Sequence, residues 1–137
     1  MRQKLFSAID SLPVPDKNGK KWVLYLPQGE QHEIALLFSA YLIRHSGHQV
    51  IYLGPDVPYQ NLFSAVKQLE PNYILFFLAG KLRKSDIKSY FTKLKTDFPK
   101  QQIRAGGRPV LFTEAGHQND KQIVVYHSVQ QLDQELN

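Results

Sequence analysis

An acid and an imidazole stand two residues apart in the segment Glu30-Gln31-His32, shortly after a run of apolar residues. A carboxylate that hydrogen-bonds one imidazole nitrogen fixes the tautomer and raises the basicity of the other nitrogen, which supports metal ligation. Polar residues here also have a simpler explanation, because helix N-termini are enriched in them for capping and for the helix dipole. The pair alone therefore leaves two interpretations open, a ligand-binding site and a polar helix start.

The segments around this pair predict one strand–helix–strand unit. Residues 22–26 are a near-continuous apolar run, typical of a parallel strand covered on both faces. From residue 31 or 32 the apolar positions take helical spacing, and Gly47 is suited to a left-handed cap at the helix end. Residues 48–53 predict the next strand, which Gly54 ends. Because ligands bind at the carboxyl ends of strands in an open parallel sheet, the acid–imidazole pair lies where chemistry is expected.

The rest of the chain continues this alternation of strands and helices. We expect further helices over residues 2–12, 57–69, 85–98 and 128–136, and further strands over residues 73–78, 102–105 and 121–127. The assignment of residues 108–120 stays open: residues 109–112 could start a short helix, and we expect residues 116–120 to be a loop. The pattern predicts an α/β protein with a flavodoxin-like five-stranded parallel sheet in the order 2-1-3-4-5 and helices on both faces. We expect residues 1–19 to be a helix and linker left from a preceding domain, and residues 20–137 to be the α/β domain.

Composition narrows the classes of function. A chain of 137 residues with 42% hydrophobic and 21% charged residues suits one globular domain. The absence of cysteine excludes disulfides, thiolate metal sites and cysteine nucleophiles. No segment is typical of a signal peptide or a membrane span, so we expect a cytoplasmic protein with no membrane partner. The net charge of +5 is concentrated in residues 81–108, where a solvated lysine-rich helix face is favoured over a nucleic-acid site because no motif accompanies the charge.

Several familiar motifs are missing. Pro27-Gln28-Gly29 has neither the glycine-rich dinucleotide fingerprint nor the Walker lysine. The third strand ends in Leu78-Ala79-Gly80, without an acid that could be phosphorylated. No serine stands on a nucleophile elbow. Nucleotide binding, phosphoacceptor and serine hydrolase functions are therefore not supported.

Spacing connects the acid–imidazole pair with two later segments. Residues 30–35, Glu-Gln-His-Glu-Ile-Ala, resemble the cobalamin-binding signature Asp/Glu-x-His-x-x-Gly. The second element of that signature, Ser/Thr-x-Leu, falls at Phe76-Phe77-Leu78, and the third, Gly-Gly, falls at Gly106-Gly107. Over nearly its whole length the chain is similar to the C-terminal cobalamin-binding-type domain of MerR-family transcriptional regulators. In those regulators a segment similar to Pro-x-Gly-Glu-x-His-Glu precedes a Leu-Leu-Phe helix and a Val-Ile-Tyr-Leu-Gly strand.

This resemblance implies a cofactor site. His32 would be the lower axial ligand of the cobalt in cobalamin, with Glu30 as its hydrogen-bond partner. The nucleotide tail would lie between the sheet and the helix after the first strand, past residues 76–78 and Gly106-Gly107.

Two positions depart from the family pattern. Ala35 replaces the glycine of the first element and adds a methyl group. Phe76 replaces the Ser/Thr whose hydroxyl faces the tail, which removes a hydrogen-bond donor and adds a ring. Because overpacking typically costs about 1–3 kcal/mol, we expect the tail pocket to be narrowed.

Three functions follow from the sequence. The resemblance implies a sensory domain of a MerR-like regulator that binds cobalamin, is not an enzyme, and meets DNA only through a helix-turn-helix domain absent from these residues. The same fold with a closed pocket could instead serve oligomerisation, including a homo-oligomer, or another protein contact. A third alternative is an enzyme subunit that carries a corrinoid for methyl transfer or radical rearrangement.

Overall fold

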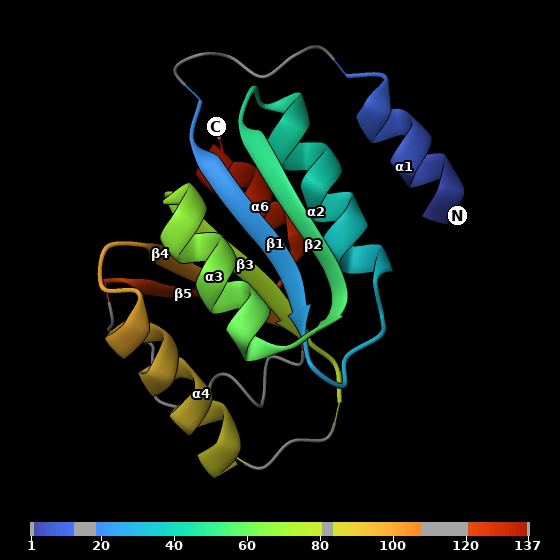
Figure 1. Cartoon of the computed structure of the whole chain (residues 1–137). Helices are drawn as coiled ribbons and strands as arrows, with labels where there is room; N and C mark the ends of the chain where they lie inside the picture. Colours follow the sequence, from blue (N-terminus) through green and yellow to red (C-terminus); the bar gives the residue numbers. More distant parts are fainter. Residues whose placement is uncertain (1, 13–18, 81–83, 108–120, 137) are drawn as a thin grey trace.

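The computed structural model describes residues 2–12, 19–80, 84–107 and 121–136 (Figure 1). The described strands are β1 (Lys21–Pro27), β2 (Gln49–Val57), β3 (Tyr73–Leu78), β4 (Gln102–Gly107) and β5 (Ile123–Tyr126). The described helices are α1 (Arg2–Asp10), α2 (Ile34–His45), α3 (Tyr59–Leu69), α4 (Lys84–Asp97) and α6 (Val129–Leu136).

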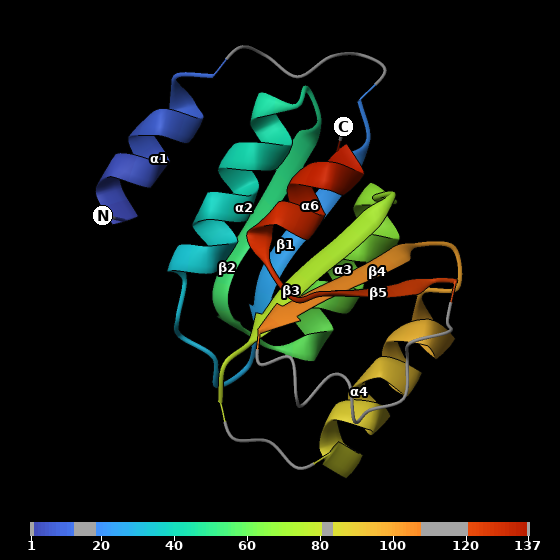
Figure 2. The same cartoon turned by 180° about the vertical axis from the view of Figure 1, so that it is seen from behind.

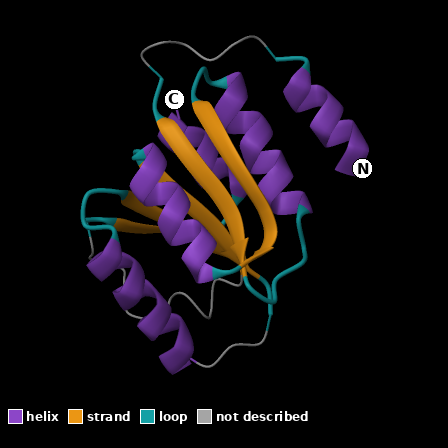
Figure 3. Cartoon of the chain, in the orientation of Figure 1, coloured by secondary structure: helices purple, strands orange, loops and turns teal. Residues whose placement is uncertain are grey.

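The five strands form one sheet in the order β2-β1-β3-β4-β5, and every neighbouring pair is parallel. Helices α3 and α4 cover one face of the sheet, and α2 and α6 cover the other (Figures 1 and 2). Helix α1 lies beside α2, away from the sheet centre. The alternation of strands and helices along the chain is plain in Figure 3. The predicted flavodoxin-like fold and its strand order are confirmed.

The core has one half on each face of the sheet. Under α3 and α4 lie the rings of Tyr25, Phe76 and Phe91, all fully buried. Under α2 and α6 the corresponding cluster includes Trp22 and Tyr126. Since β1 contributes alternate side chains to both halves, its apolar run is explained by burial on two faces.

Strand β2 is longer than the sequence predicts. Gly54 was expected to end the strand after residue 53, but β2 continues to Val57. The register against β1 shifts twice in this region, and both Gly54 (φ 91°) and Asp56 (φ 54°) have positive φ. These are the signs of β-bulges, and Pro55 is tolerated because β2 is an edge strand.

Helix α2 also differs in its start and in its buried face. It begins at Ile34, so residues 31–33 are a loop. The core contacts come from Leu36, Leu37, Ala40 and Ile43, whereas Ile34 and Phe38 keep 43% and 41% of their surface exposed. Apolar residues surround nearly the whole helix, so the periodicity of the sequence alone could not show which face is buried.

Some expectations lie outside the described residues. These include the open assignment of residues 108–120 and most of the linker after α1. The boundary between an N-terminal remnant and the α/β domain stays a prediction. Among the described helices, none combines the length and the apolar character that crossing a membrane requires.

Candidate functional site

The loop between β1 and α2 is held at the carboxyl edge of the sheet by backbone hydrogen bonds. The Glu30 N–H donates to the Pro27 carbonyl at 2.9 Å, which makes a tight turn. The loop is also tied to the end of β2, because the Gly29 N–H donates to the Asp56 carboxylate at 2.8 Å. In return, the Asp56 N–H donates to the Glu30 carbonyl at 3.0 Å. His32 is therefore an exposed side chain on an anchored loop.

Glu30 is buried, and its carboxylate bonds to other residues than His32, the partner that the resemblance implied. Its side chain is 8% exposed, and its carboxylate accepts the N–H groups of Ala79 at 3.2 Å and Gly80 at 3.1 Å. These donors belong to the segment after β3, which meets the β1–α2 loop at the lower edge of the sheet in Figure 1. Among the described residues, His32 has no hydrogen-bond partner, so Glu30 joins two loops here instead of supporting the imidazole.

Glu33 is a second carboxylate beside His32 that the sequence reasoning did not single out. It stands at the N-cap of α2, and its carbonyl accepts the Leu37 N–H at 2.9 Å. Its carboxylate accepts a 2.7 Å hydrogen bond from the Tyr52 hydroxyl. The Tyr52 ring in turn meets Phe6 of α1 edge-on, with ring centroids 5.8 Å apart. The residue after His32 is thus connected to β2 and, through it, to α1.

A mainly apolar cavity of about 220 Å³, here called the slot, opens beside this loop between α2, α6 and the strand ends. Its walls include Ala35 and Ser39 of α2, Phe77 of β3, Tyr126 of β5, and Val129 and Leu132 of α6. Of the predicted site residues, Ala35 and Gly107 line the slot. The position matches the path that the resemblance implied for a nucleotide tail, between the sheet and α2.

Phe76 lies on the other face of the sheet. It is fully buried in the cluster under α3 and α4, where its ring packs against Tyr25 and Phe91. The expectation that Phe76 faces the tail pocket is therefore corrected. Phe77 is the residue of this segment that lines the slot, because successive side chains of a strand point to opposite faces.

The two glycines of β4 differ in what they allow. Gly106 stands opposite Phe77 in the sheet, and a Cβ at Gly106 would lie 2.6 Å from Cδ1 of the Phe77 ring and closer still to Cε1. Gly107 has φ 126°, and a Cβ there would run into the backbone of Leu78. Gly106 thus makes room for an aromatic ring, whereas Gly107 is required by its own backbone.

Leu78 lines a second cavity at the same sheet edge, on the α3 and α4 side. This cavity measures about 490 Å³ and is also lined by Glu30, Tyr59 and Tyr90. Burial raises the pKa of Tyr90, and the Tyr90 hydroxyl shares a 2.6 Å hydrogen bond with that of Tyr25. The tyrosines are therefore neutral hydrogen-bonding groups at ordinary pH.

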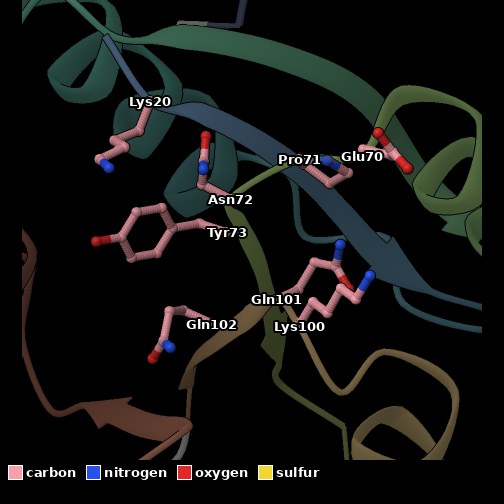
Figure 4. A pocket seen from close by; sticks show the side chains of 8 residues that line it. All are labelled: Lys20, Glu70, Pro71, Asn72, Tyr73, Lys100, Gln101 and Gln102. Atoms are coloured by element: carbon pink, nitrogen blue, oxygen red, sulfur yellow. The ribbon is translucent and has the colours of Figure 1, made fainter. Parts of the chain in front are cut away.

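A third hollow, of about 380 Å³, lies at the opposite end of the sheet (Figure 4). Figure 4 shows Lys20 before β1, Asn72 and Tyr73 at the start of β3, and Gln102 at the start of β4 around it. In parallel α/β sheets ligands bind at the carboxyl ends of the strands. This hollow is at the amino ends, so the His32 edge is the better candidate site.

The described residues contain no group of three or more His, Asp or Glu side chains that could hold a metal ion. His32 alone could bind a metal only if that metal arrived with most of its coordination sites filled, because protein metal sites need several ligands.

Comparison with known proteins first gives the class of fold. No family model matches the chain. A cobalamin-binding protein from Desulfitobacterium hafniense aligns with a TM-score of 0.60 and 24% identity, over 72% of this chain and 51% of that one. The monomethylamine corrinoid protein of Methanosarcina barkeri aligns with a TM-score of 0.69 and 14% identity, over 97% of this chain and 60% of that one. The chain has the fold of these corrinoid proteins.

Sequence similarity then points to a particular relative. The HTH-type transcriptional repressor CarH of Myxococcus xanthus is 29% identical over 100 residues, which cover 73% of this chain and 33% of the repressor. The chain thus spans about a third of the length of this relative. The predicted resemblance to the cobalamin-binding-like domain of MerR-family regulators is confirmed.

Proposed function

We propose that this domain binds a corrinoid such as cobalamin, with His32 as the lower axial ligand of the cobalt, and serves as the sensory domain of a transcriptional regulator. One observation supports this most strongly. An exposed imidazole without a hydrogen-bond partner among the described residues stands on an anchored loop, at the sheet edge where ligands bind in this fold.

The set of donors at this edge suits a corrinoid better than a bare metal ion. A corrin ring supplies the equatorial ligands of its cobalt, so the protein has to add only one axial ligand, and His32 is one imidazole. Bound cobalamin would supply a cobalt whose axial ligands can exchange. The chain's own part is to hold the imidazole in place through the turn at Glu30 and the contacts with Asp56.

The regulatory role is proposed from similarity in sequence. The relative in the comparison is an HTH-type transcriptional repressor, and contact with DNA would require a helix-turn-helix domain in the same protein. Similarity of fold does not decide between regulator and enzyme, because function depends on sites and not on folds. Corrinoid proteins of the Methanosarcina type share the fold, so a corrinoid-carrying enzyme subunit is the alternative that binding alone would not separate.

The test is a visible-spectrum titration with cobalamin. We expect the wild-type domain to shift the cobalamin spectrum, and His32→Ala to lose that shift, because a new axial nitrogen changes the cobalt absorption. His45→Ala is the matched control, since His45 is also exposed but lies at the far end of α2. Absence of any shift, or a shift that survives His32→Ala, would contradict the proposal.

A second candidate function, protein contact without a corrinoid, is favoured by one observation. Ile34 and Phe38 lie one helical turn apart on α2 and are both more than 40% exposed. If they form a contact between copies of the chain, Phe38→Ser should lower the molar mass measured by light scattering. An unchanged mass at all concentrations would remove this support for a homo-oligomer.

A further inference from the structure

The cavity on the α3 and α4 side of the sheet carries acidic and phenolic groups that the proposed function does not use. We call it the tyrosine cavity, after Tyr59 and Tyr90 in its wall. We propose that it binds a small organic amine that also carries an oxygen acceptor, such as an amino alcohol. The ammonium group would lie beside the carboxylates of Glu30 and Asp86. The tyrosine cavity and the slot lie on opposite faces of the sheet, so this inference does not depend on corrinoid binding.

The cavity lies where the fold leaves a crevice between two strand ends. Strands β1 and β3 are neighbours in the sheet, and the helices that follow them, α2 and α4, cover opposite faces (Figures 1 and 2). Open α/β sheets bind ligands in the crevice that forms where the connections change face in this way. Pro27 at the end of β1 and Leu78 at the end of β3 both line the tyrosine cavity. Its volume of about 490 Å³ is within the range of about 300–1,000 Å³ that is typical of small-molecule pockets.

The charged groups in the cavity wall are acidic. Among the described residues that line it, Glu30 and Asp86 are the charged ones, and none is a lysine, an arginine or a histidine. Glu30 is 8% exposed, and within the described part of the chain its carboxylate accepts only the backbone N–H groups of Ala79 and Gly80. Glutamates are rarely buried this deeply without a positive partner. An ammonium group would be that partner, because each carboxylate oxygen has a lone pair left after it accepts one N–H group.

The hydroxyl of Tyr90 offers the cavity a hydrogen-bond donor. It lies 2.6 Å from the hydroxyl of Tyr25, and this one bond uses only one of the two hydroxyl protons. Tyr25 is fully buried and Tyr90 is half-buried, so Tyr25 has to donate if no buried O–H is to be left without a partner. The proton of Tyr90 is then available to a ligand. Burial raises the pKa of Tyr90, which keeps this proton in place at ordinary pH. A ligand with an oxygen acceptor would use it.

The two tyrosine rings form an aromatic corner that suits a cation. The ring centroids of Tyr59 and Tyr90 are 6.0 Å apart, and the ring planes meet at 84°. The faces of aromatic rings attract positive charge, and Nζ of Lys93 already lies 4.0 Å from the centroid of the Tyr59 ring. Lys93 is not among the described residues that line the cavity. A ligand with a positive charge and an apolar body therefore matches both the carboxylates and the aromatic wall.

The experiment uses four probes that share a phenyl ring, with the full chain free of corrinoid. The amino alcohol 2-amino-1-phenylethanol is compared with neutral 1-phenylethanol, anionic mandelate and phenethylamine, which lacks the hydroxyl. Calorimetry gives the affinities, and the amide NMR signals of Ala79 and Gly80 show whether a probe reaches the Glu30 carboxylate. We expect 1-phenylethanol to bind about tenfold to a hundredfold more weakly than the amino alcohol, and mandelate not to bind. Phenethylamine should bind about twofold to tenfold more weakly.

Two substitutions that remove a charge locate the ammonium group. Glu30→Gln should weaken binding of the amino alcohol about tenfold or more, since Glu30 is buried. Asp86→Asn should weaken it by up to about fivefold, because Asp86 is exposed in the first turn of α4. Asp10→Asn is the matched control for Asp86→Asn, since Asp10 is also exposed but lies at the end of α1. It should leave the affinity unchanged.

Four results would overturn the inference. These are no shift of the Ala79 and Gly80 signals with the amino alcohol at millimolar concentration, equal affinity for the neutral or the anionic probe, full affinity in both Glu30→Gln and Asp86→Asn, and an equal loss in Asp10→Asn. If Glu30→Gln lowers the melting temperature so far that binding is not measurable, Asp86→Asn against Asp10→Asn decides. Equal affinity for phenethylamine and the amino alcohol would refute the role of the Tyr90 proton.

Discussion

The contact between Phe77 and Gly106 can be tested by a double-mutant cycle. In Gly106→Ala the new Cβ would lie 2.6 Å from Cδ1 of Phe77, about 1 Å inside the ordinary carbon–carbon separation of about 3.5–4.0 Å. Such overpacking costs about 1–3 kcal/mol, and the stiffer unfolded chain returns about 0.4–1 kcal/mol. We therefore expect a net destabilisation of about 1–2 kcal/mol in the wild-type background.

The cycle predicts that Phe77→Ala removes this cost. Phe77→Ala alone should destabilise the domain, by less than the about 3–5 kcal/mol of a fully buried phenylalanine, since the ring is half-buried. With the ring gone, Gly106→Ala should be neutral or slightly stabilising, so the two changes should show a coupling energy of about 1–3 kcal/mol. Urea unfolding followed by the fluorescence of Trp22, the single tryptophan, measures each free energy with the slope m held constant.

Gly107→Ala is the matched control within the same strand. Here the added Cβ would be 2.9 Å from the carbonyl carbon of Leu78 and nearer still to its oxygen, at a residue with φ 126°. No change at Phe77 can relieve a clash with backbone, so this substitution should cost more than about 2 kcal/mol in both backgrounds. If Gly106→Ala costs the same with and without the Phe77 ring, the packing described for the slot is wrong.

Three further predictions concern the loop, the tyrosines and α6. Glu30→Ala removes the acceptor of two backbone N–H groups and should lower the free energy of unfolding by about 1–3 kcal/mol. Hydrogen exchange should become faster in the segment after β3, and Glu30→Gln should recover part of the loss. Unchanged hydrogen exchange in Glu30→Ala would contradict this prediction. Burial raises the pKa of Tyr25 and of Tyr126 above the unfolded value of about 10, so the folded state keeps protons that the unfolded state loses, and stability should fall as pH rises above about 10. Unfolding midpoints that stay constant through this range would refute that assignment. Glu135→Ala breaks the ion pair with Arg104, which is 6% exposed, and should lower the free energy of unfolding by about 2–3 kcal/mol. This is less than the about 3–5 kcal/mol of a fully buried pair, because Glu135 is partly exposed. Unchanged protection of α6 from hydrogen exchange would count against this prediction.

The sheet could be predicted from sequence because its signals are local. The apolar run of β1 and the alternation of strands and helices determine a parallel sheet with few alternatives. The end of β2 was missed because Gly54 and Pro55 usually end a strand, and only the register with β1 shows that they form bulges on an edge. The start of α2 was missed for a related reason, since residues 31–33 are polar enough for either a first turn or a loop.

The partners of the candidate site were harder to predict than its position. That His32 stands at the carboxyl edge follows from its place after a strand, and the structure puts it there. That Glu30 bonds to Ala79 and Gly80 does not follow from sequence, because those residues lie about fifty positions away in the chain. Long-range side-chain pairs depend on loop geometry, which residue types and spacing do not determine.

Which phenylalanine lines the slot depends on a shift of one residue along β3. Aligning Ser/Thr-x-Leu with Phe76-Phe77-Leu78 put Phe76 toward the tail, and because the side-chain period of a strand is two, a shift of one residue exchanges the faces. The register between β3 and β4, with Phe77 opposite Gly106, decides in favour of Phe77. This changes the physical question about the ligand. A ring at Phe76 would have been an obstacle that a tail must displace. The Phe77 ring instead forms one wall of an open cavity, and Phe76 packs in the core on the opposite face of the sheet, so the departure from the family pattern at Phe76 does not close the slot.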